Sequence, residues 1–345
     1  MREAVDHKLW LQSFMRELEY YKEYLHDKEI ISVFFGGGTP SLAHESVIAG
    51  VIEYIAANYT MTEAVEITME ANPTSVEAQK FKSLALAGVN RVSLGIQSLR
   101  DENLKFLGRE HDVLEARGAI ELARENFARY SFDLIYALPN QTIAQWKVEL
   151  EEAISMASGH LSLYQLTIEK GTHFFGAHRA GEFVMPDNET SADMYIRTED
   201  ILNTHGYRAY EVSNYAMRGK ECLHNMQYWR YGDYLGIGPG AHGRIGQGGT
   251  HFAIQNISSP EAWLKLVASR GVGVQRKDEL TTTEAATERI LMGLRTAEGI
   301  ALENIIDQTR LSELMDNGLL KLESGRVIAT MQGRLLLNSV IEYLI

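Results

Sequence analysis

Apolar residues recur along the chain with two alternating periods, and these periods predict a succession of strands and helices. Short apolar runs at 31–35, 65–70, 91–95, 131–136, 161–167 and 208–213 have the composition of β-strands. Between them, apolar residues at helical spacing predict helices at about 42–57, 75–87, 112–127, 142–157 and 189–205. Strands that alternate with helices at this spacing imply right-handed crossovers and a parallel sheet or barrel.

The two ends of the chain depart from this alternation. Residues 6–28 predict an amphipathic helix before the first strand, where a helix would ordinarily follow an earlier strand. Near the other end, helices are expected at 281–295, 298–307 and 311–317, a hairpin joins 319–323 to 326–330, and a last helix begins at Gln332. Helices and a hairpin in this order are typical of a winged-helix module.

Composition and charge narrow the function classes. The 345 residues suffice for one large α/β domain with a smaller one appended, and the net charge of −13 argues against a nucleic-acid-binding surface. Residues 279–345 hold 6 Lys and Arg against 10 Asp and Glu, so the winged-helix-like end is expected to pack or to dock a partner. No apolar stretch is long enough for a transmembrane segment, and no signal-peptide core is present. Together with the single cysteine, Cys222, this predicts a cytoplasmic protein without internal disulfides.

Polar residues and glycines gather where successive strands are predicted to end. The first strand runs into Gly36-Gly37-Gly38-Thr39-Pro40, a loop that lets a ligand approach the bare backbone. Later strand ends carry Glu70, Gln97 and Asp133, and Arg109 stands just before a helix. One by one, these residues could be helix caps or surface ion pairs. On one rim, they are suited to a zwitterionic ligand that bears hydroxyl groups.

Six motifs carry a resemblance to a known family: GGGTPS, EANP, RVSLGIQS, LGREHD, DLIYALP and HNMQYWRYGDYLGIGPGAHG. Together they resemble the radical S-adenosylmethionine proteins related to oxygen-independent coproporphyrinogen III oxidase, and most closely the heme-chaperone branch of these proteins. The resemblance covers nearly the whole chain. It implies an α/β fold with a partial (βα)6 TIM-like barrel in 1–215, a connecting segment in 216–275 and a winged-helix-like α+β domain in 276–345. It also implies that S-adenosylmethionine lies across the strand ends, in contact with Gly37, Gly38, Thr39, Glu70, Gln97, Arg109, Asp133, Thr167 and His242.

One signature of that family is absent from this sequence. The family holds a 4Fe–4S cluster with Cys-x3-Cys-x2-Cys after its first strand, whereas this chain has one cysteine, far downstream. The missing segment coincides with the strand that the opening helix lacks. The expectation is therefore a family member without its first strand and cluster ligands, through a misplaced start, a shortened chain or a true loss. Cys222 is interpreted as an ordinary small apolar residue.

The stretch His224-Asn225-Met226-Gln227-Tyr228-Trp229 matches the HNxxYW motif of the chaperone branch. An imidazole beside aromatic rings suits an iron porphyrin, which makes His224 a candidate axial ligand for heme as cargo. The alternative is a core cluster of Tyr228, Trp229 and Tyr231 in which His224 is a satisfied hydrogen-bonding residue.

Three functions remain open on the sequence. The favoured one is a heme chaperone whose partners are heme and heme-acceptor proteins, with a homodimer as a further expectation. The second is an oxygen-independent coproporphyrinogen III oxidase, which decarboxylates propionates by radical chemistry. The third is a fold kept only for protein contacts.

Overall fold

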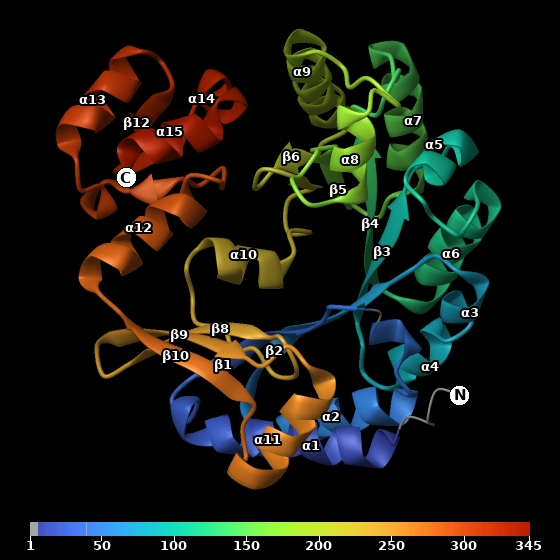
Figure 1. Ribbon diagram of the computed structural model, residues 1–345, viewed down its shortest axis with the longest axis vertical. Coiled ribbons are helices and arrows are strands. Elements are labelled where there is room, and N and C mark those ends of the chain that lie inside the picture. The colour runs from blue at the N-terminus through green and yellow to red at the C-terminus, as the bar shows by residue number, and fades with distance from the viewer. Residues whose placement is uncertain (1–5, 39) are drawn as a thin grey trace.

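The computed structural model describes residues 6–38 and 40–345. Within them, one seven-stranded sheet with the order β1-β2-β3-β4-β5-β7-β6 curls into a half-barrel (Figure 1). Its strands are β1 (Glu29–Phe35), β2 (Thr60–Ala71), β3 (Arg91–Gln97), β4 (Arg129–Tyr136), β5 (His160–Gln165), β6 (Arg208–Ala209) and β7 (Asn214–Ala216). Each of the neighbouring pairs from β1 to β5 is parallel, as the alternation of strands and helices predicts.

Helices cover the convex face of the half-barrel. They are α1 (His7–Tyr21), α2 (Glu45–Asn58), α3 (Ser75–Ala78), α4 (Phe81–Leu86), α6 (Val113–Asn126), α7 (Ile143–Met156) and α9 (Asn188–Thr204). Two more helices, α5 (Asp101–Phe106) and α8 (His173–Arg179), lie beyond the ends of β3 and β5. Side chains alternate across each strand, so that Val92, Leu94 and Ile96 of β3 enter the core beneath the helices. The intervening residues Arg91, Ser93, Gly95 and Gln97 line the opposite, concave face.

Two predicted elements of the half-barrel differ from the structure. The sixth strand expected at 208–213 is not a parallel strand, because the Glu211 carboxylate accepts the N–H of Ser213 and the side-chain amide of Asn214 and turns the chain back. The result is the antiparallel pair β6 and β7. The single helix expected at 75–87 is divided into α3 and α4.

The remaining elements form two smaller sheets. Strands β8 (His242–Gln247), β9 (Thr250–Asn256) and β10 (Val274–Leu280) make an antiparallel sheet beside α11 (Pro260–Arg270). The last part contains α12 (Thr282–Gly293), β11 (Ile300–Ala301), α13 (Gln308–Asp316), β12 (Leu320–Glu323), β13 (Arg326–Ala329), α14 (Met331–Leu335) and α15 (Leu337–Leu344). The capping box of Thr281 with Glu284 and the hairpin at Ser324-Gly325 are both confirmed.

The helix predicted at 298–307 is wrong. Gly299 has a φ of +65°, which ends helical geometry, and Ile300 pairs with Val327 as β11. Only a 3₁₀ turn at Leu302–Asn304 remains of the expected helix. The boundaries at 215 and 275 stay predictions.

The buried carboxylate of Glu17 joins α1 to the smaller sheet. It accepts the backbone N–H groups of Gly238 and Gly273, each at 2.7 Å, and it also accepts the indole N–H of Trp263 and the side-chain amide of Asn256. Burial raises the pKa of Glu17, while these four donors oppose the shift. The loop 236–240 is thereby fixed against the opening helix. No helix of the described residues is long and apolar enough to cross a membrane.

Candidate functional site

The glycine loop after β1 presents open backbone. Gly37 and Gly38 have φ values of +80° and +61°, in the left-handed region that favours glycine, and a methyl group on either would meet no atom within 4 Å. The N–H of Gly37 donates to Oε2 of Glu70 at 3.2 Å, which ties the loop to the end of β2. Thr39, the third predicted contact of this loop, lies outside the described residues.

The loop after β1 and the loop after β2 are both hydrogen-bonded to one residue of α3. The buried carboxylate of Glu77 accepts the hydroxyl of Ser41, the N–H of Asn72 at 2.8 Å and the side-chain amide of Asn72 at 3.1 Å. One carboxylate of α3 therefore holds both loops in place, and the geometry of the rim does not depend on a ligand.

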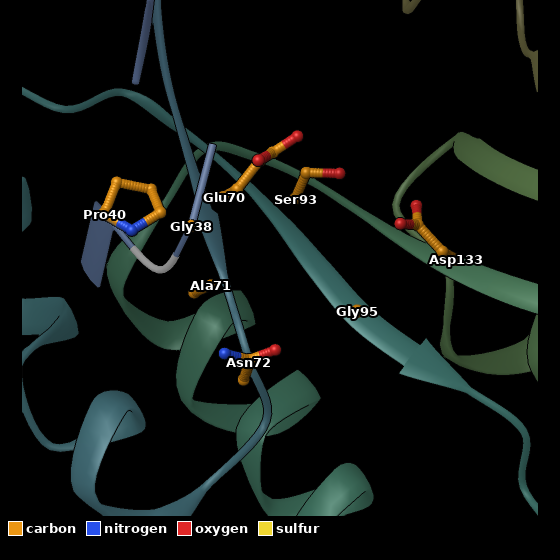
Figure 2. Close-up of a pocket in the computed structure, with 8 residues that line it drawn as sticks. All are labelled: Gly38, Pro40, Glu70, Ala71, Asn72, Ser93, Gly95 and Asp133. Carbon is orange, nitrogen blue, oxygen red and sulfur yellow. The ribbon is translucent and has the colours of Figure 1, made fainter. Parts of the chain in front are cut away.

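A cavity of about 190 Å³ opens between these loops and the next two strands. Its lining residues are Gly38, Pro40, Glu70, Ala71, Asn72, Ser93, Gly95 and Asp133. Figure 2 shows Glu70, Ser93 and Asp133 side by side, with their oxygen atoms on the same side of the sheet. Three of the predicted contact residues, Gly38, Glu70 and Asp133, thus meet at one cavity.

The two carboxylates of the cavity have different environments. Burial is the main cause that raises the pKa of Asp133 to about 7, and the negative charge of Glu70 adds to the shift. A hydrogen bond with Ser162 and the charges of Arg91 and Arg109 lower the pKa in opposition. Asp133 therefore changes its charge near neutral pH.

The other predicted residues lie around this cavity without lining it. Gln97 ends β3 with a φ of +71°, a strained value for a residue other than glycine. Its amide has room because residue 95 is glycine, where a methyl group would lie 3.2 Å from Nε2 of Gln97. Arg109 is exposed beyond α5 and reaches Asp133 only through its charge. Thr167 is exposed two residues past β5, and His242 is exposed at the start of β8.

The sequence analysis missed five lining residues: Pro40, Ala71, Asn72, Ser93 and Gly95. Ser93 and Gly95 alternate with the buried Val92, Leu94 and Ile96 along β3. This period of two places them on the same face as Arg91 and Gln97. That signal was available in the motif RVSLGIQS.

Deeper on the concave face, Glu66 of β2 is the centre of a charged network. It is only 2% exposed, and its Oε2 lies 3.0 Å from Nη1 of Arg129 and 3.9 Å from Nε of Arg91. Arg129 also donates to the carbonyl groups of Lys220 and Glu221, at 3.2 and 2.7 Å. The network therefore connects three strands of the half-barrel to the segment that precedes α10 (Leu223–Trp229).

The same carboxylate receives the start of α10, which carries the HNxxYW motif. Oε1 of Glu66 accepts the N–H of His224 at 3.3 Å and the thiol of Cys222 at 3.2 Å. Cys222, the N-cap residue, makes no capping hydrogen bond of its own to this helix. Glu66 thus supplies the negative charge that a helix N-terminus favours.

Cys222 is more than a small apolar residue. It is 1% exposed and packs against Tyr210, Ala216 and Met226, and its thiol donates to Glu66. Burial raises its pKa to about 11, so it is a neutral thiol at physiological pH and no thiolate ligand.

The imidazole of His224 stacks on Phe34 of β1, with ring centroids 4.4 Å apart and planes 16° from parallel. Its ring nitrogens have no hydrogen-bond partner among the described residues, and burial lowers its pKa. The alternative, a core cluster of Tyr228, Trp229 and Tyr231, does not form. Tyr228 is 40% exposed and contacts Trp229 and Tyr234, whereas Tyr231 stacks on His251.

The comparisons with known proteins identify the family. The Radical SAM superfamily matches residues 9–153, and the HemN C-terminal domain matches residues 280–336. Radical S-adenosyl methionine domain-containing protein 1, mitochondrial, from Danio rerio is 37% identical, over 97% of this chain and 80% of its own length. Heme chaperone HemW from Escherichia coli is 34% identical, over 99% of this chain and 91% of its own. The chain belongs to the HemW family of radical S-adenosylmethionine proteins.

A solved structure agrees with the HemW-family fold. Coproporphyrinogen III oxidase (HemN) from Escherichia coli superposes with a TM-score of 0.80, over 100% of this chain and 84% of that chain. At 21% sequence identity this similarity concerns the fold, and it confirms the radical S-adenosylmethionine half-barrel.

Membership of this superfamily implies S-adenosylmethionine and a 4Fe–4S cluster, and the residues fit only the first. The open glycine loop, two carboxylates and nearby amide and guanidinium groups suit a zwitterionic nucleotide. The sequence has one cysteine, and no three His, Cys, Asp or Glu residues in the described part of the chain gather as metal ligands. The residues present therefore do not fit the cluster.

We predict that Glu66→Gln lowers the free energy of unfolding by about 3 kcal/mol, because it leaves the buried guanidinium of Arg91 without a carboxylate. Hydrogen exchange at 222–229 should become faster, since α10 loses the charge at its N-terminus. The matched control is Glu63→Gln, an exposed position on the same strand. Equal urea midpoints for the two variants would refute the role of Glu66.

Proposed function

We propose that this protein is a heme chaperone, which binds heme and hands it to acceptor proteins. The proposal is supported by four bacterial relatives named heme chaperone HemW, from Haemophilus influenzae, Escherichia coli, Bacillus subtilis and Mycobacterium tuberculosis. They are 32% to 36% identical to this chain and each aligns with at least 88% of it.

The observation that carries the proposal is the state of His224. A lowered pKa keeps this imidazole neutral at physiological pH, and neutral imidazole is the form that ligates iron. Its ring nitrogens are not engaged by other side chains of the described residues, while Phe34 and Glu66 hold the ring and the backbone in place. An unengaged nitrogen on a positioned ring is suited to the axial position of heme.

We further propose S-adenosylmethionine as the ligand of the cavity at the strand ends. Gly37, Gly38 and Thr39 would receive its methionyl part. The other proposed contacts are Glu70, Gln97, Arg109, Asp133, Thr167 and His242. When bound, the nucleotide supplies a sulfonium group and a source of a deoxyadenosyl radical. The protein groups would orient it by accepting its ammonium and hydroxyl protons and by pairing with its carboxylate.

The oxidase reaction of the alternative function needs three thiolates for the cluster, and the sequence supplies one. We propose the cytoplasm as its location; the relatives from Danio rerio, Bos taurus and Mus musculus have the word mitochondrial in their names. Acceptor proteins and a homodimer are part of the same proposal.

The function is tested by hemin titration followed by transfer of the bound hemin to apomyoglobin. We expect His224→Ala to weaken the tight phase of hemin binding at least about tenfold and to remove the low-spin component of the Soret spectrum. The control variant lacks both His7 and His26, which are exposed. Should the control alter the spectrum while His224→Ala leaves it unchanged, the assignment of the ligand is wrong. A protein that takes up no hemin is no chaperone.

Gly38→Val should abolish binding of S-adenosylmethionine, because the valine methyl groups would fill the open approach to the cavity. Gly248→Val is the matched control, since Gly248 has a φ of +60° and equally open surroundings but lies in the β8–β9 turn. Both substitutions cost about 1 to 2 kcal/mol of stability, through a positive φ at a residue with a Cβ atom. Isothermal calorimetry with the two variants measures the difference, and equal affinities would place the nucleotide elsewhere.

The affinity for S-adenosylmethionine should increase between pH 6 and pH 8. Since the pKa of Asp133 is about 7, the carboxyl group is largely protonated at the lower pH and ionised at the higher one. The ionised group attracts the cationic ligand, so Asp133→Asn should bind weakly at both pH values. An affinity of the unaltered protein that does not change with pH would contradict a contact with Asp133.

A further inference from the structure

Three phenylalanines form a cluster beyond the ends of β3 and β5, away from His224 on α10. The ring centroids of Phe106 and Phe174 are 5.2 Å apart, those of Phe106 and Phe183 are also 5.2 Å apart, and those of Phe174 and Phe183 are 6.2 Å apart. Phe106 ends α5, whereas Phe174 belongs to α8 and Phe183 follows it. Figure 1 shows α5 and α8 as neighbours at this end of the sheet.

The cluster is not enclosed as a core would be. All three phenylalanines are half-buried, and the adjoining Val184 is 72% exposed. None of the three belongs to the buried clusters that stabilise the fold. The ring of Phe183 is edge-on to those of Phe106 and Phe174, with interplanar angles of 88° and 78°, so a flat apolar ligand could lie on the face of one ring and against the edge of its neighbour.

Two exposed imidazoles flank this surface. The ring of His178 is 5.5 Å from that of Phe183, and the ring of His173 is 6.4 Å from that of Phe174. Neither imidazole makes a side-chain hydrogen bond or an ion pair with the described residues. Both are therefore available as nitrogen ligands.

One guanidinium group completes the set. Arg179 follows His178, is exposed and forms no ion pair with a described carboxylate. Glu182 lies in the same segment, so the patch has no strong net charge. Arg179 would act as a hydrogen-bond donor to an individual carboxylate rather than as part of a positive field.

We propose that this surface, made by Phe106, Phe174, Phe183, His173 and His178, is a second heme-binding site. The porphyrin would lie on the face of one phenyl ring and against the edge of its neighbour, one imidazole would take an axial position on iron, and Arg179 would pair with a propionate. Heme combines a flat macrocycle, an iron atom that binds nitrogen ligands and propionate groups at one edge, and the patch has a group suited to each. The inference rests on the proposed function, since it concerns the same cargo.

The exposure of the site determines its role. His224 lies in the first turn of α10 and its ring is stacked on Phe34, whereas the imidazoles of α8 are open to water and to other proteins. Heme on the exposed surface would bind more weakly and exchange more readily. It would serve to take up or to release heme.

The test is a hemin titration that counts bound equivalents. We expect two equivalents for the unaltered protein and one for the double variant His173→Gln/His178→Gln, which keeps the phenylalanine packing and the His224 spectrum. His224→Ala should keep the weaker equivalent. The matched control His26→Gln/His205→Gln removes two exposed imidazoles elsewhere and should still bind two. Hemin dimethyl ester, which lacks free carboxylates, should occupy the α8 surface more weakly than hemin.

The outcomes separate the two proposals. If the protein binds hemin and the α8 double variant keeps both the stoichiometry and the spectrum, the second site is refuted while the chaperone function stands. If the control loses an equivalent as the double variant does, the binding is adventitious and the second site is likewise refuted. If the unaltered protein binds no hemin, both proposals fail.

Discussion

The ion pair of Glu66 with Arg129 and Arg91 is the interaction on which the proposed heme site depends. A carboxylate this deeply buried is stable only when its charge is compensated. The guanidinium groups of Arg129 and Arg91 lie 3.0 and 3.9 Å from Oε2 and compensate the charge without donating a hydrogen bond to it, whereas Oε1 accepts the N–H of His224 and the thiol of Cys222. Cys222 makes no cap of its own, so Glu66 holds the first turn of α10, and the side-chain amide of Asn225 donates to the hydroxyl of Tyr210 as a second polar contact of this helix with the half-barrel.

Buried carboxylates also hold irregular loops at three other places. Glu77 accepts the N–H of Asn72, Glu149 accepts the N–H of Leu99 at 2.7 Å, and Glu17 accepts those of Gly238 and Gly273. In each case a helix supplies a buried carboxylate to backbone donors that no strand or helix satisfies. Loops held in this way have a defined shape before any ligand arrives, and a preformed rim lowers the entropy lost on binding.

Much of this architecture follows from the spacing of apolar residues and from the glycine and proline residues between the predicted elements. The parallel strands and their helices were predictable because apolar alternation and helical spacing are local properties of the chain. One error was non-local, since the pairing of Ile300 with Val327 replaced a helix. The other was local, because the side chain of Glu211 bonds to Ser213, two residues further on, and turns a strand into a hairpin. For the site, the ends of strands indicated Glu70 and Asp133. The role of Cys222 was not predictable, since its partner Glu66 is 156 residues away.

The nucleotide cavity and His224 share strand β1. Phe34 stacks on His224, and a methyl group at Gly36 would fall 2.6 Å from Cε1 of the same phenyl ring, so glycine at that position makes room for it. The next residue, Gly37, is bonded to Glu70 of the cavity. A ligand that displaced the glycine loop would therefore act on the ring against which His224 is held. Two discrete positions of Phe34 would be needed for such a contact to transmit occupancy from one site to the other.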